Sequence, residues 1–172
     1  MSIHATMTQY ARMLNNLDAW LQAGIAHAEA KKFDPEILVQ ARLAPDMYAL
    51  VQQVQSACDA AKYAAAYLSG QTAPSHADTE KTIAELRARI AKCVAYLGTF
   101  KESDFAGGGE RRVAPAWMQG RSLGGDAYLT RISIPNFYFH VTAAYAILRH
   151  NGVALGKADF VGVKDWQEIG DW

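Results

Sequence analysis

The sequence has few cysteines and no arrangement of them that indicates a metal or redox site. Cys58 and Cys93 are the only two in 172 residues. They lack a CxxC spacing and a neighbouring histidine, so they do not form a recognisable zinc motif. Both lie among apolar residues of expected helices, which favours buried, reduced thiols. A nucleophilic cysteine would need a cationic, partly exposed setting that the sequence does not indicate.

The sequence also lacks an excess of charge and a long hydrophobic run. Lys and Arg together number 17, as do Asp and Glu, so no net charge attracts nucleic acid or an anionic membrane. No apolar run approaches the roughly 18–20 residues that a membrane-spanning helix needs. Residues 1–14 show neither the basic nor the apolar region of a secretory signal. We expect a cytoplasmic protein that binds neither nucleic acid nor membrane.

What the sequence does have is helical periodicity. Apolar residues recur at three- and four-residue steps, as in the helices of a bundle. They do so in residues 5–31, 45–69, 78–100 and 135–150. Asp34 and Pro35 predict a short additional helix after the first. Asp78 or Thr79 is expected to cap the third, with Arg89 on its solvent-exposed side.

The helical period stops in residues 101–134, which are rich in glycine. The segment AYLTRISI (127–134) alternates and predicts a strand. VAPAWM (113–118) is a weaker strand, since Pro115 confines it to an edge. GGGERR (107–112) lacks the Lys-Ser/Thr of a phosphate-binding loop and is interpreted as a flexible turn. We expect an irregular β-hairpin packed over the bundle.

The expected organisation is a single all-α domain over residues 1–172. It is a four-helix bundle with a hairpin insertion at about 101–134 and an irregular tail at about 153–172. The aromatic residues late in the chain must pack on this bundle or on a partner. They are Tyr138, Tyr145, Phe160, Trp166 and Trp172. With the balanced charge they favour a homodimer; a monomer whose tail folds back is the alternative.

One histidine lies on the inner face of the last helix. In NFYFHVTAAYAILRHNG (136–152), Asn136 and His140 share a face with two alanines. His140 is therefore either a hydrogen-bonded core residue or part of a site. The 45–69 helix carries a polar stripe, of which Gln55 and Lys62 lie nearest its apolar face. That stripe is either solvated or turned toward His140.

The sequence contains three distinctive segments: ARLAPDMYALVQQVQSACDAAK, TIAELRARIAKCVAYL and IPNFYFHVTAAYAILRHNGVALGKADFVG. They resemble the DinB/YfiT-like superfamily and, within it, an uncharacterised bacterial and fungal family, a domain of unknown function. The resemblance implies a four-helix bundle. Better-known members of the superfamily hold a divalent metal with a histidine on the second helix and an HxxxH pair on the fourth. Some transfer low-molecular-weight thiols, isomerise maleylpyruvate or act as hydrolases.

This sequence departs from that ligand set. His140 matches the second histidine of the pair, but Asn136 and Gln55 occupy the other two positions. Amides are poor ligands for transition metals. We therefore expect no metal cofactor, and a small molecule bound in a polar pocket formed by Asn136, His140, Gln55, Tyr138 and Lys62. His140 is the catalytic candidate.

Two alternatives remain open. The first is a metal- or histidine-dependent enzyme of the thiol transferase, isomerase or hydrolase type, with one divalent transition metal at His140 in the metal-dependent case. The second is a structural or interaction protein that works as a homodimer. The ligand identity cannot be inferred from the fold.

Overall fold

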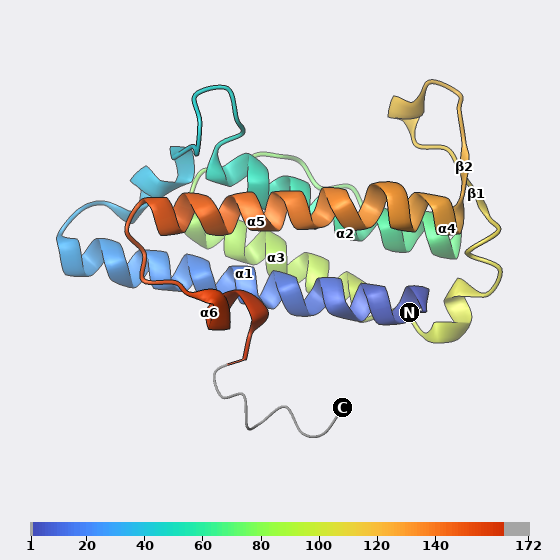
Figure 1. Ribbon diagram of the computed structural model, residues 1–172, viewed down its shortest axis with the longest axis horizontal. Helices are drawn as coiled ribbons and strands as arrows, with labels where there is room; N and C mark the ends of the chain where they lie inside the picture. The colour runs from blue at the N-terminus through green and yellow to red at the C-terminus, as the bar shows by residue number, and fades with distance from the viewer. Residues whose placement is uncertain (1, 164–172) are drawn as a thin grey trace.

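The computed structural model describes residues 2–163, which form a bundle of four long helices (Figure 1). In chain order the elements are α1 (Ile3–Lys31), the 3-10 helix η1 (Pro35–Gln40), α2 (Leu50–Ser69), α3 (Ile83–Leu97), the 3-10 helix η2 (Glu102–Phe105), β1 (Arg112–Val113), the 3-10 helix η3 (Ala116–Met118), β2 (Leu123–Gly124), α4 (Gly125–Tyr128), the π-helical turn η4 (Leu129–Ser133), α5 (Ile134–His150) and α6 (Lys157–Val161). The all-α bundle with a small hairpin in its third connection is confirmed.

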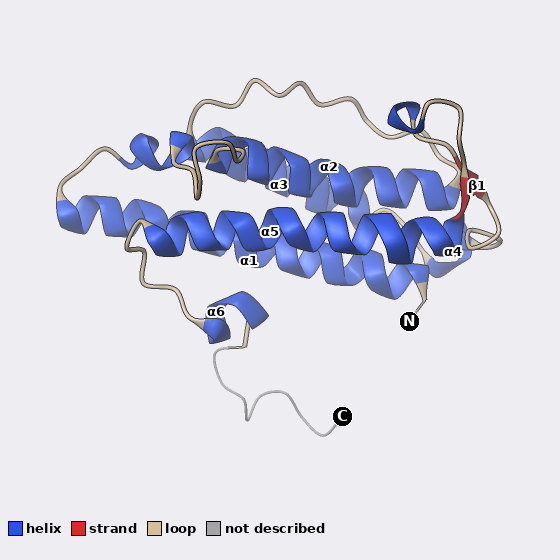
Figure 2. Ribbon diagram, turned by 45° about the horizontal axis from the view of Figure 1, so that its top comes forward, coloured by secondary structure: helices blue, strands red, loops and turns tan. Residues whose placement is uncertain are grey.

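The four long helices pack so that α1 and α2 each contact both α3 and α5. The two short strands pair antiparallel at the end of the bundle where α1 begins (Figure 2). The helices bury their apolar stripes in a common core, which includes Leu14, Leu17, Leu21, Val54, Ala61, Leu86, Ile90, Phe137, Ala144 and Ile147. Within residues 2–163 no helix is long and apolar enough to cross a membrane.

The two cysteines lie in this core, where α2 meets α3. Both Cys58 and Cys93 are free and fully buried, and the Cys93 thiol donates a hydrogen bond to the Cys58 carbonyl at 3.2 Å. The neighbouring Cys93 thiol and burial raise the pKa of Cys58. The interpretation as buried, reduced thiols agrees with this environment, because a raised pKa disfavours the reactive thiolate.

Two helices begin later than the sequence predicts. α2 was expected from residue 45 but starts at Leu50, because the Leu50 amide bonds the Ala41 carbonyl and closes a loop over residues 41–50. α3 was expected from Asp78 or Thr79 but is capped by Thr82. Thr82 and Glu85 form a capping box, a T-x-x-E signal present in the sequence.

The predicted strand AYLTRISI is wrong. Residues 125–150 are helical throughout, as α4, the π-helical turn η4 and α5. In η4 the Ile134 amide donates to the Leu129 carbonyl, five residues back. Pro135 follows directly; its ring has no N–H and would clash with the carbonyl of residue 131 in a regular α-helix, and a π turn relieves such a conflict. In the alternating pattern of AYLTRISI, every second residue of one side lies four positions further along the chain. Tyr128 and Ile132, for example, therefore also have the i,i+4 spacing of a helix.

The late aromatic residues pack against their own bundle. Phe160 of α6 stacks on Trp20 of α1 at 5.4 Å between ring centroids, and Tyr145 meets both rings edge-on. The Tyr138 hydroxyl accepts a hydrogen bond from Gln9. These three residues therefore do not argue for a partner. Trp166 and Trp172 lie outside the described residues, and the homodimer stays a prediction.

The start of α4 leaves no room for a side chain at Gly125. A Cβ there would lie 1.8 Å from the Gly108 carbonyl oxygen, whereas a Cβ at Gly124 would find its nearest neighbour at 3.7 Å. Gly125→Ala should therefore lower the free energy of unfolding by about 1–3 kcal/mol, because the backbone must move. Gly124→Ala, the matched control, should change it by less than about 0.5 kcal/mol. Urea unfolding compares them, and equal effects would contradict the close approach.

Candidate functional site

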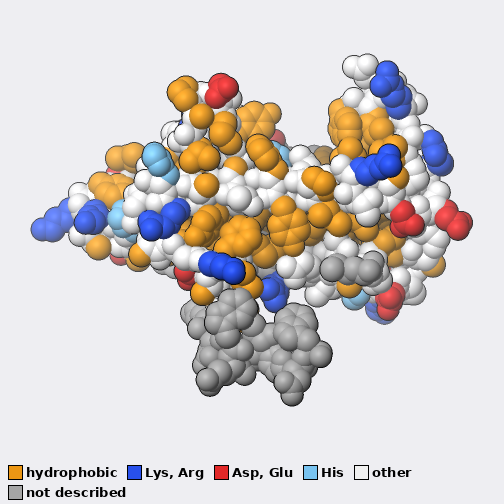
Figure 3. Space-filling model, in the orientation of Figure 1, with side chains coloured by type: hydrophobic (Ala, Val, Ile, Leu, Met, Phe, Trp, Pro, Cys, Tyr) orange, Lys and Arg blue, Asp and Glu red, His pale blue; other side chains and the backbone are white. Residues whose placement is uncertain are grey.

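A groove of about 1070 Å³ runs over α2 and α5. Its walls are the loop before α2, the connection between α2 and α3, and the segment that holds η3. Figure 3 shows the surface hollowed between two raised loops at its upper edge. The lining residues are Gln40, Arg42, Tyr48, Val51, Gln52, Gln55, Ser56, Asp59, Ala60, Tyr63, Tyr67, Asp78, Glu80, Ala116, Trp117, Tyr128, Ile132, Ser133, Asn136 and His140.

His140 is held in one orientation by Gln53. Its Nδ1 lies 2.8 Å from Gln53 Oε1. The amide of Gln53 is oriented in turn, because Gln53 Nε2 donates to the Tyr48 carbonyl at 3.3 Å. The oxygen of Gln53 must therefore face the imidazole, and Nδ1 must carry the proton. In the neutral ring this leaves Nε2 as a hydrogen-bond acceptor.

The acceptor nitrogen of His140 is free to meet a ligand. His140 is 9% exposed and lines the groove. Within residues 2–163 no protein atom forms a hydrogen bond with its Nε2. Burial lowers the pKa of His140 below its ordinary value, so the ring is neutral at neutral pH. The ring of Tyr48 lies parallel to it, 6.4 Å between centroids.

Of the expected pocket residues, three line the groove and two do not. His140 and Asn136 are one helical turn apart on α5, and Gln55 lies across from them on α2. Tyr138 is outside the lining and contacts α1 through Gln9. Lys62 is also outside it: its side chain is fully buried behind the groove.

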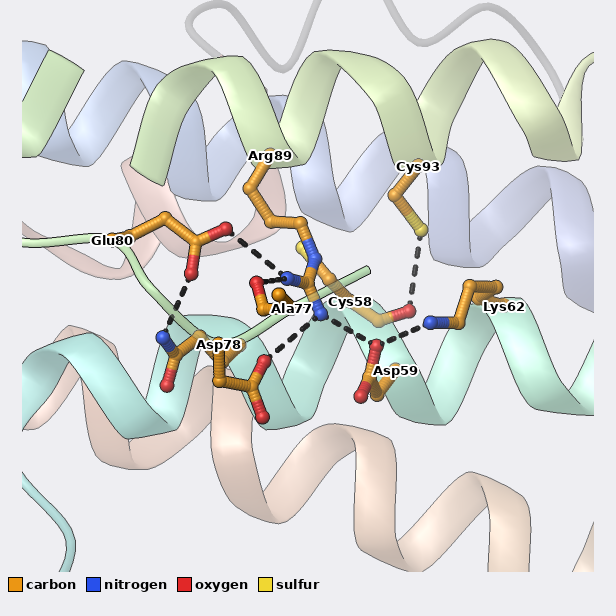
Figure 4. Close-up of polar contacts among 9 residues, drawn as sticks. Cys58, Asp59, Lys62, Ala77, Asp78, Glu80, Arg89 and Cys93 are labelled. Carbon is orange, nitrogen blue, oxygen red and sulfur yellow. Dashed lines mark hydrogen bonds and ion pairs between the residues drawn. The ribbon is translucent and has the colours of Figure 1, made fainter. Parts of the chain in front are cut away.

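Lys62 belongs to a cluster of charges centred on the buried Arg89, whose carboxylate partners are partly exposed (Figure 4). Lys62 Nζ lies 2.8 Å from Asp59 Oδ1, and Arg89 Nη2 lies 2.7 Å from the same oxygen. Arg89 also contacts Asp78 at 3.3 Å and Glu80 at 3.1 Å. Arg89 is only 3% exposed, so its expected place on the solvent side of α3 is wrong.

The cluster ties the connection between α2 and α3 to the groove. Arg89 donates to the Ala77 carbonyl and to Glu80, and Glu80 Oε2 accepts from Gln55 Nε2 at 2.8 Å. Burial alone would raise the pKa of Glu80. The hydrogen bond from Gln55, a backbone hydrogen bond and Arg89 together have a larger, opposite effect, so the pKa of Glu80 lies below its ordinary value. The carboxylate is therefore ionised at neutral pH.

The donor set does not fit a transition metal. Gln55 uses its nitrogen to hold Glu80, Gln53 uses its oxygen to hold His140, and Asn136 is exposed. Within residues 2–163 no three His, Cys, Asp or Glu side chains converge as a metal-binding group. A catalytic zinc site needs about three such ligands. At this position there is one imidazole, that of His140, and it is hydrogen-bonded to the Gln53 amide.

The sequence reasoning missed two residues that define this site. Gln53 lies three residues after Leu50 and four before Ala57, on the apolar face of α2, and a polar residue at such a position indicates a buried hydrogen bond. Trp117 enters the groove wall from η3, and no local sequence signal places it there.

The fold places the protein among the DinB-like helical bundles. A crystal structure described as a DinB family member protein from Shewanella denitrificans is 46% identical in sequence. The match covers 93% of this chain and 91% of that chain, with a TM-score of 0.88. Residues 3–161 match the family described as Domain of unknown function (DUF1993), and the chain belongs to this family. No curated protein matches it.

Removing Arg89 should destabilise the protein strongly. Arg89→Met leaves Asp59, Glu80 and Asp78 without their shared partner and should cost about 3 kcal/mol. Arg87→Met is the matched control on the same helix. Arg87 pairs with Asp18 in a half-exposed bidentate contact, and its loss should cost about 0–1 kcal/mol. Chemical unfolding measures both variants, and similar losses would contradict the importance of the cluster around Arg89.

The depressed pKa of His140 should appear in the pH dependence of stability. The unfolded chain binds a proton at this residue near pH 6.5, whereas the folded protein does so only at lower pH. The free energy of unfolding should therefore fall as pH is lowered below about 6.5, until the folded pKa is passed. His140→Asn should lose this part of the profile. Urea unfolding from about pH 5 to 8 and an NMR titration of the imidazole test it; titration above about 6.5 would contradict it.

Proposed function

We propose that this protein binds a small molecule in the groove over α2 and α5, without a catalytic metal, and that His140 Nε2 accepts a hydrogen bond from it. One observation carries the proposal: a nine-tenths buried imidazole, fixed as an acceptor by Gln53, has no protein donor among the described residues. Nε2 is not among the polar side-chain atoms of residues 2–163 that are buried without a partner, so it remains accessible from the groove. A ligand donor can therefore reach it and form a hydrogen bond.

The shape and composition of the groove support the proposal. Its volume of about 1070 Å³ lies just above the range of about 300–1,000 Å³ that is usual for small-molecule sites. The lining contains aromatic side chains, amides and carboxylates. Rigid aromatic faces supply contact area, and convergent polar groups fix the orientation of a ligand.

The second candidate function is histidine-dependent catalysis in the same groove. The tautomer of His140 favours it, because a neutral imidazole with a free Nε2 can take a proton from a bound substrate as a general base. Gln53 would act as the positioning residue, since it fixes which nitrogen carries the proton. The reaction would belong to the isomerase, hydrolase or thiol transferase type.

The direct test is a thermal-shift screen of a chemically diverse compound library. A ligand that binds only the folded state must raise the melting temperature. Compounds that raise it for the wild type should fail, or bind about tenfold more weakly, with His140→Asn. His150→Asn is the matched control, because His150 is exposed at the end of the same helix and does not line the groove.

Two outcomes would contradict the proposal. The first is a library in which no compound binds, or in which binding is unchanged by His140→Asn. The second is elemental analysis of untagged protein that finds about one zinc or nickel per chain, lost in His140→Ala. That result would favour the metal-dependent alternative. We expect no stoichiometric transition metal, because Gln55 and Asn136 stand at the expected ligand positions.

A further inference from the structure

The floor of the groove presents acceptor atoms that lack protein donors. The first is His140 Nε2. The second is Gln55 Oε1, because the amide is oriented by the bond from its nitrogen to Glu80, and no hydrogen bond within residues 2–163 uses its oxygen. The third is Asp59 Oδ2, since Lys62 and Arg89 both contact the other carboxylate oxygen. In Figure 4 the second oxygen of Asp59 likewise has no contact drawn to it.

These acceptors come from two helices and face one groove. Gln55 and Asp59 are one turn apart on α2, and His140 lies on the adjacent α5. All three residues line the groove. A ligand that satisfies them must supply several hydrogen-bond donors. An acceptor-rich ligand such as a carboxylate would be repelled by the same atoms.

Two of the three cations at the site are buried. Lys62 and Arg89 are 0% and 3% exposed and pair with Asp59. Arg42 is exposed and is the only Lys or Arg among the described lining residues; its Nη1 donates to the Met47 backbone carbonyl. The charges at the groove surface are therefore mainly the carboxylates of Asp59, Asp78 and Glu80.

Exposed aromatic faces complete the groove. Trp117 is 62% exposed and Tyr48 53%, although both are large aromatic residues, and they come from different walls. Tyr63 of α2 also lines the groove, and its ring already contacts a cation, because Lys62 Nζ lies 4.5 Å from the ring centroid. The face of an aromatic ring carries negative potential and attracts an organic cation. The acceptor atoms and the aromatic faces thus both favour a cationic ligand that donates hydrogen bonds.

From this arrangement we infer that the groove selects a small organic amine in its protonated form, with the ammonium bound by the acceptor atoms of the groove floor and its carbon skeleton against Trp117. The inference rests on the proposed function of the groove and adds the chemical class of the ligand. An ammonium carries up to three hydrogen-bond donors and no acceptor, which suits a lining rich in acceptors.

Three probes that share a phenyl ring test the class. They are 2-phenylethylamine, 2-phenylethanol and phenylacetate, which carry an ammonium, a hydroxyl and a carboxylate. Each is titrated into the full-length protein by calorimetry up to about 10 mM. We expect the amine to bind about tenfold more tightly than the alcohol, and the carboxylate to bind more weakly than either.

A surface variant tests the aromatic contribution without disturbing the core. Asp59→Asn would disrupt the pairing of Arg89 and Lys62, so Trp117→Ala is used instead. It should weaken amine binding about fivefold. Phe139→Ala is the matched control, because Phe139 is 56% exposed on α5 but does not line the groove. It should leave amine binding within about twofold.

The inference fails if the alcohol or the carboxylate binds as tightly as the amine, if none of the three binds, or if both variants have the same effect. Its failure is distinguishable from that of the proposed function. A neutral or anionic compound from the library that binds only when His140 is present would support the groove as a binding site and overturn the amine class alone.

Discussion

The site depends on the pairing of one buried guanidinium. Arg89 of α3 reaches across to Asp59 of α2 and binds the extended connection through Glu80, Asp78 and the Ala77 carbonyl. The charge of a buried arginine cannot be lost by deprotonation, so its surroundings must supply carboxylates. Those carboxylates come from segments that line the groove. Because Arg89 must be paired, one wall and part of the floor of the groove are fixed in place.

Hydrogen bonds also orient two amides on α2. Gln53 donates to the Tyr48 carbonyl, and its oxygen is therefore turned to His140. Gln55 donates to Glu80, and its oxygen is therefore turned away from that partner. An amide has a donor end and an acceptor end, so fixing one end determines the other. The two amides are two residues apart on one helix. Gln53 fixes the proton on Nδ1 of His140, and Gln55 leaves its oxygen as an acceptor in the groove.

The sequence predicts the helices well and the site in part. Long apolar stripes define α1, α2, α3 and α5, because burial of one face dominates their stability. The strand at 127–134 was a wrong interpretation, since eight residues can satisfy an alternating and a helical period at once. His140 was identified from its place on an apolar face. Lys62 was expected near the apolar face of α2, and it is buried there beside Asp59 of the same helix. The burial of Arg89 could not be predicted, because its carboxylate partners come from α2 and from the connection before α3, and no local pattern encodes those contacts.

His140 keeps the outer hydrogen bond that a metal-bound histidine commonly has, with one ring nitrogen donating to a protein oxygen. That bond alone does not define a metal site. It fixes a neutral ring whose Nε2 lone pair is directed away from Gln53. The neighbouring groups then determine whether that lone pair binds a metal ion or accepts a hydrogen bond. Three imidazoles would converge on a cation that accepts their electron pairs. Here the groove that His140 lines also contains Gln55 and the carboxylate of Asp59, which is already shared by Arg89 and Lys62. Acceptors of this kind pair with protons on a ligand rather than with a metal ion, which is the chemical basis of the proposed recognition of a donor-rich molecule.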